Sequence, residues 1–319
     1  AQNILVLVQD AGSRAYFEHL LPDLGIRGVH IQTFSDWAAQ ILELKNWQLA
    51  EDDYSEVGLL YAEAKLQALR ALPSDIQHHK QIYKTLQTAY QTYFSPTQLE
   101  ELQAQKQAAV LDRIDLTVLL KIYQQTAGEL SAPQEYFQEL KRGGYRKKVN
   151  RWALKYNLMV VDEFQNYLPE QVALLKSTLN ARIQSMVYVG DLGQQTRLGT
   201  MQDWQSIDEA IPTERIVRLY KVYRNTRQIL EYVRGRGYAV EIPEQIKDGP
   251  AVVEIKVNSP ADEIAHIKKI MGADSFVGIL AMNKKYLGLF KKEFKGQRNI
   301  KCLSFVEAQG LEFDEVFMV

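Results

Sequence analysis

The sequence predicts an α/β protein built on parallel sheets, and three observations support this fold class. Short apolar runs, such as residues 3–8 and 158–161, have the continuous hydrophobicity of buried parallel strands. Segments with helical spacing lie between these runs. Polar residues follow directly after residues 158–161 and 185–189, and ligand sites of open α/β sheets collect at such strand ends.

Length and composition indicate a multi-domain protein without a membrane partner. At a typical 100–200 residues per domain, 319 residues correspond to about two domains. A single cysteine, Cys302, excludes an internal disulfide, and no Cys/His set has metal-ligand spacing. With no signal sequence and no apolar stretch long enough to span a bilayer, we expect a cytoplasmic protein.

Between residues 43 and 150 the sequence is rich in Gln, Leu, Ala and Tyr at helical spacing, which predicts an all-helical insertion. Pro73, Pro96 and Pro133 are expected to separate its helices, and Gly143-Gly144 to return the chain to the sheet. A tyrosine stripe in this region serves either base stacking or, more commonly, core packing. Its members are Tyr83, Leu86, Tyr90 and Tyr93.

A second sheet is predicted after residue 215. Its expected strands are residues 216–219, 252–257, 276–282, 300–305 and 315–319. The predicted domains are therefore residues 1–42 with 151–215, the insertion 43–150, and residues 216–319.

Candidate chemistry begins at the end of the strand 158–161, which is followed by Asp162, Glu163 and Gln165. Asp162 can hold Mg²⁺, and Glu163 can polarise a water that attacks a terminal phosphate. An isolated Asp-Glu pair is usually only solvated. A second strand, 185–189, ends in Gly190-Asp191-Leu192-Gly193-Gln194, which directs a second polar group to the same crevice.

Four segments in this order resemble the UvrD/Rep type of superfamily 1 helicases. They are Asp-Glu-Phe-Gln (162–165), Gly-Asp-Leu-Gly-Gln (190–194), Tyr-Arg-Asn-Thr (223–226) and Ala-Gln-Gly-Leu-Glu-Phe (308–313). The resemblance implies two RecA-like P-loop NTPase-type domains, with the insertion in the first and a partial second domain. It also implies ATP and Mg²⁺ as cofactors and single-stranded DNA as a partner, with RNA left open.

The resemblance further implies roles for individual residues. Asp162 would serve Mg²⁺, Glu163 the attacking water, Gln194 the γ-phosphate and the signal between domains, and Arg224 the γ-phosphate from the second domain. Arg224 in a surface ion pair is the alternative. The remaining nucleotide contacts carried over from the family are Gln165, Asp191, Tyr223, Gly310 and Glu312.

Residues 33–38 look like the family's Thr-Phe-His-x-x-Ala element, which touches the single strand. This makes Thr33 and Phe34 candidate nucleic-acid contacts, although Thr-Phe before a helix is also an ordinary N-cap with a core aromatic. Ser304, before the last motif, is a further candidate. The stretch from Ile4 to Gly28 resembles the HelD branch in particular.

Several family features are missing or altered. No GxxxxGK[ST] phosphate loop is present; the nearest segment, residues 10–14, has one glycine and no Lys-Ser/Thr. We expect a helicase core cut at both ends, and a natural pseudo-enzyme is the rival interpretation. The aromatic that usually follows Gln194 is absent, and Trp204 either replaces it or belongs to the core. Val306 and Gln309 replace the usual His and Lys.

Because the net charge is −1, nucleic acid must be held by local basic surfaces. Two clusters qualify, although such runs are more often solvated helix faces. They are Lys141, Arg142, Arg146, Lys147, Lys148 and Arg151, and Lys284, Lys285, Lys291, Lys292, Lys295 and Arg298.

The leading hypothesis is an ATP-driven translocase or helicase on single strands. The alternative is a helicase-like protein without unwinding activity that binds a partner, such as RNA polymerase or a second helicase or nuclease subunit in a repair, recombination or transcription complex. An unrelated P-loop or Rossmann-type enzyme is disfavoured, because no glycine fingerprint follows any strand.

Overall fold

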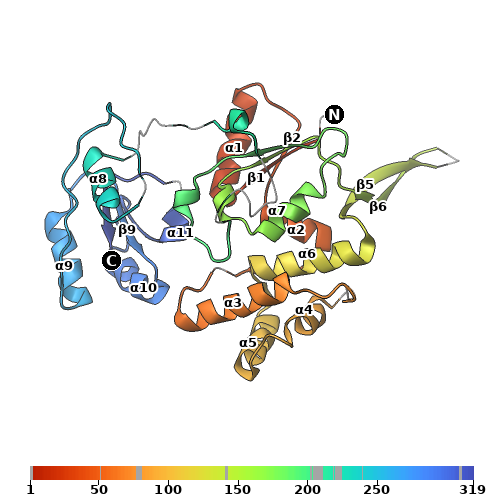
Figure 1. Ribbon diagram of the computed structural model, residues 1–319, viewed down its shortest axis with the longest axis horizontal. Helices are drawn as coiled ribbons and strands as arrows, with labels where there is room; N and C mark the ends of the chain where they lie inside the picture. The colour runs from red at the N-terminus through yellow and green to blue at the C-terminus, as the bar shows by residue number, and fades with distance from the viewer. Residues whose placement is uncertain are drawn as a thin grey trace. The chain divides into compact units, whose positions relative to one another are not determined.

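The computed structural model describes residues 3–50, 52–76, 81–140, 143–201, 203, 211–217, 219, 225–238, 240–308 and 311–319. The chain divides into two compact units, Ala1–Ala210 and Ile211–Val319. Both are built on parallel sheets with helices, as the fold class predicts (Figure 1). No helix in the described ranges is long and apolar enough to cross a membrane.

Unit 1 (Ala1–Ala210) is centred on a four-stranded parallel sheet. Its strands are β1 (Ile4–Val8), β2 (Val29–Thr33), β7 (Leu158–Val161) and β8 (Ser185–Tyr188), in the order β2-β1-β7-β8. Ile4 is aligned with Val29 on one side and with Leu158 on the other, so the neighbouring strands end at the same level. The helices outside the insertion are α1 (Ala11–Asp23), α2 (Phe34–Leu42) and α7 (Pro169–Lys176).

Helix α2 shows how the sequence builds this unit. The Thr33 hydroxyl caps it by accepting a hydrogen bond from the Asp36 N–H at 3.1 Å. Phe34, Trp37 and Ile41 recur at helical spacing and are buried. They belong to the same core cluster as Leu5 and Leu7 of the sheet, so α2 is held by burial of one apolar face.

The insertion is mostly helical, with α3 (Glu56–Arg70), α4 (Ile82–Tyr90), α5 (Pro96–Gln107) and α6 (Arg113–Ala127). Capping boxes begin α5 at Ser95 and α6 at Asp112. Leu86 and Tyr90 are fully buried, which confirms core packing for this part of the tyrosine stripe. The insertion shares one hydrophobic core with the sheet rather than forming a separate one.

The prediction that the insertion is all-helical was wrong. Residues 48–49 and 110–111 form a short parallel pair, β3 (Gln48–Leu49) and β4 (Val110–Leu111). A longer antiparallel hairpin follows, made of β5 (Ser131–Glu139) and β6 (Tyr145–Ala153). Pro133 therefore lies in a strand and does not separate helices, and Gly144 belongs to the hairpin turn region, with a positive φ of 90°.

Unit 2 (Ile211–Val319) contains a three-stranded parallel sheet in the order β10-β9-β11. Its elements are β9 (Val277–Ala281), β10 (Ile300–Ser304), β11 (Glu315–Met318), α8 (Arg227–Gly235), α9 (Pro260–Ile270), α10 (Lys284–Glu293) and α11 (Phe305–Ala308). Residues 252–257, and residues 216, 217 and 219 of the expected strand 216–219, are not strands. These short apolar runs have no sheet partner, and strand propensity alone does not form a strand.

Candidate functional site

The four parallel strands of unit 1 bring the predicted polar groups to one edge of the sheet. Thr33 ends β2, Gln9 follows β1, Asp162 follows β7, and Val189-Gly190 follows β8. Because neighbouring strands end at the same level, these segments lie side by side. This confirms that the two strand-end clusters share an edge, as parallel strands require.

The backbone of Asp162 and Glu163 is held in a tight turn at this edge. The Asp162 N–H donates to the Leu7 carbonyl at 2.9 Å, which continues the sheet ladder by one residue. Glu163 has φ 50° and ψ 41°, in the left-handed region that costs a non-glycine residue roughly 1–2 kcal/mol. The turn lets the Phe164 N–H donate to the Val189 carbonyl at 3.0 Å, so the local strain is maintained by the neighbouring strand.

Gln165 joins the two strand-end segments. Its side-chain Nε2 donates to Glu163 Oε2 at 2.5 Å, and its Oε1 accepts from the Asp191 N–H at 3.1 Å. The side chain is fully buried, so this amide is committed to both contacts. Gln165 therefore restrains the Glu163 carboxylate and fixes its position relative to Asp191.

Asp191 organises the turn that carries Gln194. Its carboxylate accepts from the Gly193 N–H and from Gln194 Nε2, both at 2.9 Å. Gln194 is exposed and lies in the short helix Leu192–Gln194. Its amide therefore lies at the surface of unit 1, three residues after Asp191, whose N–H contacts Gln165.

The two adjacent carboxylates are electrostatically strained. Burial raises the pKa of Asp162, and the charge of Glu163 raises it further. Since the folded-state pKa lies above the unfolded value, ionisation of Asp162 opposes folding. This destabilisation is absent below the unfolded pKa, grows between the unfolded and the folded pKa, and is complete above the folded one. Such a pair suits a divalent cation, because Mg²⁺ prefers carboxylate oxygens and would offset the excess negative charge.

The strand-end edge lies within a region that matches a known protein family. The family model for the UvrD/REP helicase N-terminal domain matches residues 11–196, which is more than half of the chain and includes both polar segments. The chain belongs to the UvrD/Rep helicase family. A search of curated proteins finds no match.

In this helicase-family chain, the segment after Gln194 contacts both the sheet edge and the insertion. The Thr196 N–H donates to Asn166 Oδ1 at 3.1 Å, and the Thr196 carbonyl accepts from the Tyr54 hydroxyl at 2.5 Å. Arg113, at the start of α6, donates to the Leu198 carbonyl and contacts Asp52 at 3.3 Å. The segment is thus attached to the insertion and to the residues that follow Glu163.

Sequence reasoning missed this set of contacts. Arg197 lies 3.8 Å from Asp52, and its guanidinium donates at 3.0 and 2.8 Å to the amide oxygen of Gln9 when that amide faces it. Because Asp52 and Arg113 are far from Arg197 in sequence and belong to no motif, their partnership is visible only in the fold. The one available signal was Arg197 itself, an arginine three residues after Gln194.

The predicted nucleic-acid residues of this helicase-family chain are at least partly buried where the structure describes their side chains. Thr33 is partly buried and serves as the α2 N-cap. Phe34 is 7% exposed and packs edge-to-face on Tyr167, as a core aromatic behind the N-cap. Ser304 is buried at the end of β10, where its hydroxyl accepts from the Glu307 N–H at 3.3 Å.

Other predicted residues divide between exposed positions and undescribed ones. Glu312 is exposed in the loop before β11. Tyr223, Arg224, Trp204, Gln309 and Gly310 lie outside the described residues, as does the side chain of Val306. Of the first basic cluster, Lys141 and Arg142 are also outside them, and the other members lie on strand β6 rather than on a helix. The second cluster is partly the exposed face of α10, where Lys285, Lys291 and Lys292 are exposed.

Gly190→Ala is expected to displace Gln165 from its bridging position. A Cβ at Gly190 would lie 2.1 Å from Gln165 Oε1 and 2.8 Å from Phe164 Cδ1, so both buried side chains would have to move. We expect a destabilisation of about 1–3 kcal/mol. All four tryptophans precede residue 211, so urea unfolding followed by tryptophan fluorescence measures it within unit 1.

Gly12→Ala is the matched control for Gly190→Ala. At Gly12 the nearest atom to a new Cβ is Asp10 Oδ1 at 3.2 Å, a contact that a shift of a few tenths of an ångström would relieve. We expect its unfolding midpoint to stay close to that of the unaltered chain. Equal midpoints for Gly190→Ala and Gly12→Ala would show that the contact between Gly190 and Gln165 is not tight.

Glu163→Gln is expected to lower the pKa of Asp162. The substitution removes the neighbouring negative charge and keeps the burial, so the pKa should fall but remain above its ordinary value. A carboxyl-carbon NMR titration of the two proteins measures this directly. An unchanged pKa would show that the Asp162 and Glu163 carboxylates do not interact.

Proposed function

We propose that the protein is an ATP-dependent translocase on single-stranded nucleic acid, a DNA helicase of UvrD/Rep type. The observation that carries the proposal is the arrangement at the end of β7, where Asp162 and Glu163 are adjacent and Gln165 links Glu163 to Asp191. Membership of the helicase family supports the choice of reaction.

In this proposal each residue of the edge has one task. Bound Mg²⁺ would neutralise charge on the phosphates of ATP. Asp162 would hold the ion. Glu163 accepts a proton from the attacking water, and Gln165 keeps its carboxylate oriented. Gln194, whose amide donates to Asp191, would sense the terminal phosphate and report hydrolysis to the rest of the chain.

The family resemblance extends the proposal to residues that this geometry does not test. Tyr223, Arg224, Gly310 and Glu312 are proposed nucleotide contacts, and Thr33, Trp204 and Ser304 proposed strand contacts. The proposed domains remain residues 1–42 with 151–215, 43–150 and 216–319. Since the 319 residues hold no phosphate loop, turnover also needs phosphate-binding groups other than those described.

ATP hydrolysis by the intact protein, with and without single-stranded DNA, tests this proposal. We expect turnover that the strand stimulates, because translocation couples the two. The same assay on these 319 residues alone should show no turnover. Absence of turnover in the intact protein under both conditions would contradict the proposal.

A partner-binding protein without unwinding activity is the second candidate. The observation in its favour is the segment after Gln194, which contacts Asp52, Tyr54 and Arg113 of the insertion and presents no aromatic residue between Gln195 and Thr200. Binding to purified RNA polymerase, together with weak and salt-insensitive binding to single strands, would favour it over the translocase.

A further inference from the structure

The hairpin of β5 and β6 extends away from the sheet and helices of unit 1 (Figure 1). Its strands pair antiparallel from Ser131 with Ala153 to Glu139 with Tyr145. Residues 134–139, 145–150 and 152 are exposed, whereas Arg151 and Ala153 at the base are partly buried. An isolated two-stranded ribbon is marginally stable, so such a feature is retained only with support at its base.

Arg151 provides this support. Its guanidinium donates to the Ile41 carbonyl at 2.7 Å and to Ser131 Oγ at 3.2 Å, and forms an ion pair with Glu43. It also lies over the Tyr123 ring, with Cζ 5.2 Å from the centroid. The charge of Arg151 is therefore used within the protein, and the outer part of the hairpin projects from a fixed base.

The two faces of the hairpin differ in charge. Residues directly opposite in the register share a face, and residues alternate along each strand. What we call the basic face consists of Gln134, Tyr136, Gln138, Arg146, Lys148, Asn150 and Trp152. The opposite face consists of Glu135, Phe137, Glu139, Tyr145, Lys147 and Val149.

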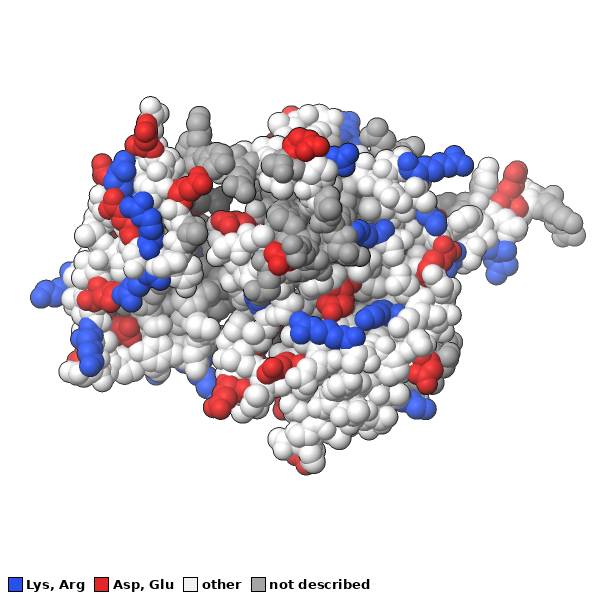
Figure 2. Space-filling view, in the orientation of Figure 1, with Lys and Arg blue, Asp and Glu red and all other residues white. Residues whose placement is uncertain are grey.

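Only the basic face carries uncompensated positive charge. It contains no carboxylate, and within the described part of the chain neither Arg146 nor Lys148 forms an ion pair. On the opposite face, Lys147 pairs with Glu135 at 2.6 Å. In Figure 2 the hairpin projects from the rest of unit 1 at the right of the view, and charged side chains lie along it. The alternation thus places Arg146 and Lys148 on one face and the paired Lys147 on the other.

Aromatic rings lie among these cations. Tyr136 is directly opposite Lys148 and is 38% exposed, and Trp152 is 53% exposed. Lys148 and Trp152 are four residues apart on one strand, which is about 13 Å along the hairpin. Cations that contact phosphates, alternating with aromatic rings on which bases stack, are the combination that sequence-tolerant single-strand binding uses.

We propose that the basic face of the hairpin binds single-stranded nucleic acid, with Arg146 and Lys148 on phosphates and Tyr136 and Trp152 stacked on bases. This deepens the proposed function, on which the choice of a nucleic acid partly rests. The contact is separate from the strand-end edge of β7 and β8, so it would hold the strand without taking part in hydrolysis.

The test is the affinity of the intact protein for a fluorescein-labelled oligothymidylate, titrated at several salt concentrations without nucleotide. Arg146→Gln with Lys148→Gln should flatten the slope of log K against log salt by about 1.4, at about 0.7 per phosphate contact. Trp152→Ala should weaken binding about 5- to 150-fold. Lys147→Gln is the matched control and should change the slope little, because Glu135 already compensates its charge.

Three results would overturn the inference. Equal effects of Lys147→Gln and of the double variant would show diffuse electrostatic attraction without a preferred face. Unchanged binding by the double variant and by Trp152→Ala would place the strand elsewhere, while strand-stimulated ATP hydrolysis would leave the proposed function intact. Binding to duplex only would overturn this inference. Absence of any single-strand binding would overturn both this inference and the proposed function. All variants are at exposed positions, so matching unfolding midpoints should confirm that they fold.

Discussion

Glu163→Gln is expected to reduce ATP turnover of the intact protein by about 10²–10⁴-fold, the usual contribution of a general base. The substitution keeps the size of the side chain and leaves an amide oxygen for the hydrogen bond from Gln165 Nε2. It removes the group that accepts the proton from water. Since Asp162 is unchanged, we expect nucleotide affinity to be retained. A coupled phosphate-release assay and equilibrium binding of a fluorescent ATP analogue measure the two quantities separately.

Glu129→Gln serves as the control for this experiment, because Glu129 is a surface carboxylate in an exposed ion pair with Lys155. Its turnover should equal that of the unaltered protein. Full turnover in Glu163→Gln would remove Glu163 from the mechanism and with it the proposed site. Loss of nucleotide binding together with turnover would instead show that Glu163 helps to form the binding site.

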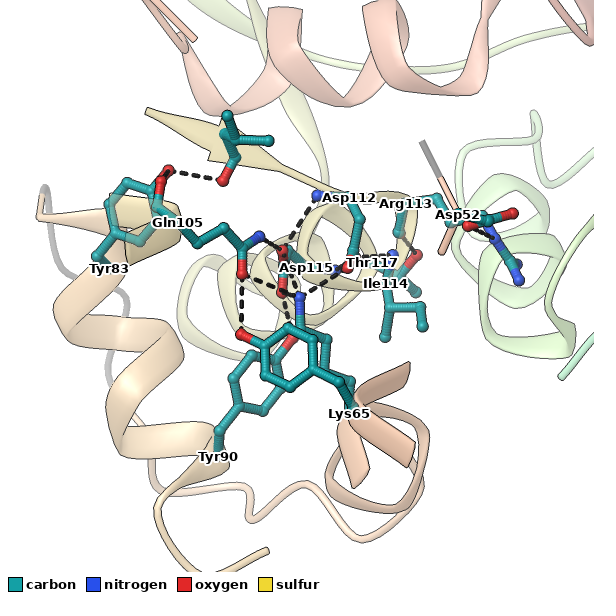
Figure 3. A network of polar contacts seen from close by, with 12 residues as sticks. Asp52, Lys65, Tyr83, Tyr90, Gln105, Asp112, Arg113, Ile114, Asp115 and Thr117 are labelled. Atoms are coloured by element: carbon teal, nitrogen blue, oxygen red, sulfur yellow. Dashed lines mark hydrogen bonds and ion pairs between the residues drawn. The ribbon is translucent and has the colours of Figure 1, made fainter. Parts of the chain in front are cut away.

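Lys65→Met is expected to destabilise unit 1 by about 3–5 kcal/mol, the usual cost of leaving a buried ion pair with one partner. Lys65 has no exposed surface, and its Nζ lies 2.6 Å from Asp112 Oδ2 and 2.9 Å from the Asp115 carboxylate. Figure 3 shows the ammonium enclosed by these groups together with Tyr90 and Gln105. The network joins α3, α4, α5 and α6 through one cation.

The electrostatics of this network explain the expected size of the effect. Burial by itself would lower the pKa of Lys65, but Asp112 and Asp115 outweigh it and the pKa is raised. Burial raises the pKa of Asp115, with Asp112 adding to the rise. Without the ammonium, the two carboxylates would face each other in a buried site. Among the described residues, the Tyr90 hydroxyl, at 2.8 Å, and nearby amides would remain as donors to Asp115.

Urea unfolding followed by tryptophan fluorescence measures this destabilisation, since all four tryptophans lie in unit 1. Lys106→Met, at an exposed position in the last turn of α5, is the matched control and should change stability by less than about 0.5 kcal/mol. Adding Asp115→Asn to Lys65→Met should recover part of the loss, because it removes one uncompensated charge. Equal stability of Lys65→Met and Lys106→Met would show that the cation is not structurally required.

The strand-end site was predictable because its signal is local. The apolar run 158–161 and the following Asp162, Glu163 and Gln165 are contiguous, and parallel packing then brings their neighbours to the same edge. Thr33 illustrates the limit of such reasoning. A threonine before a helix fits both a phosphate contact and an N-cap, and only the hydrogen bond to the Asp36 N–H shows that it is the N-cap here.

The hairpin was missed because its sequence lacks the pattern that identifies strands. A half-buried strand alternates apolar and polar residues, whereas both faces of residues 134–139 and 145–150 are exposed and carry polar or charged side chains. For the described residues of 216–219 and for 252–257, strands were predicted where none form. They are apolar enough for strands, but strand formation also requires a partner strand at the right register.

The sequence by itself therefore determined the family, the α/β class and the polar residues at the ends of β7 and β8, because these depend on residues close together in the chain. The tertiary structure decided which charges are buried or free. Lys65 meets Asp112 and Asp115 across about 50 residues, Arg113 meets Asp52, and the β5–β6 register separates Lys148 from Lys147. The physical reason is that desolvation and pairing of a charge depend on groups brought together by folding, which no local pattern records.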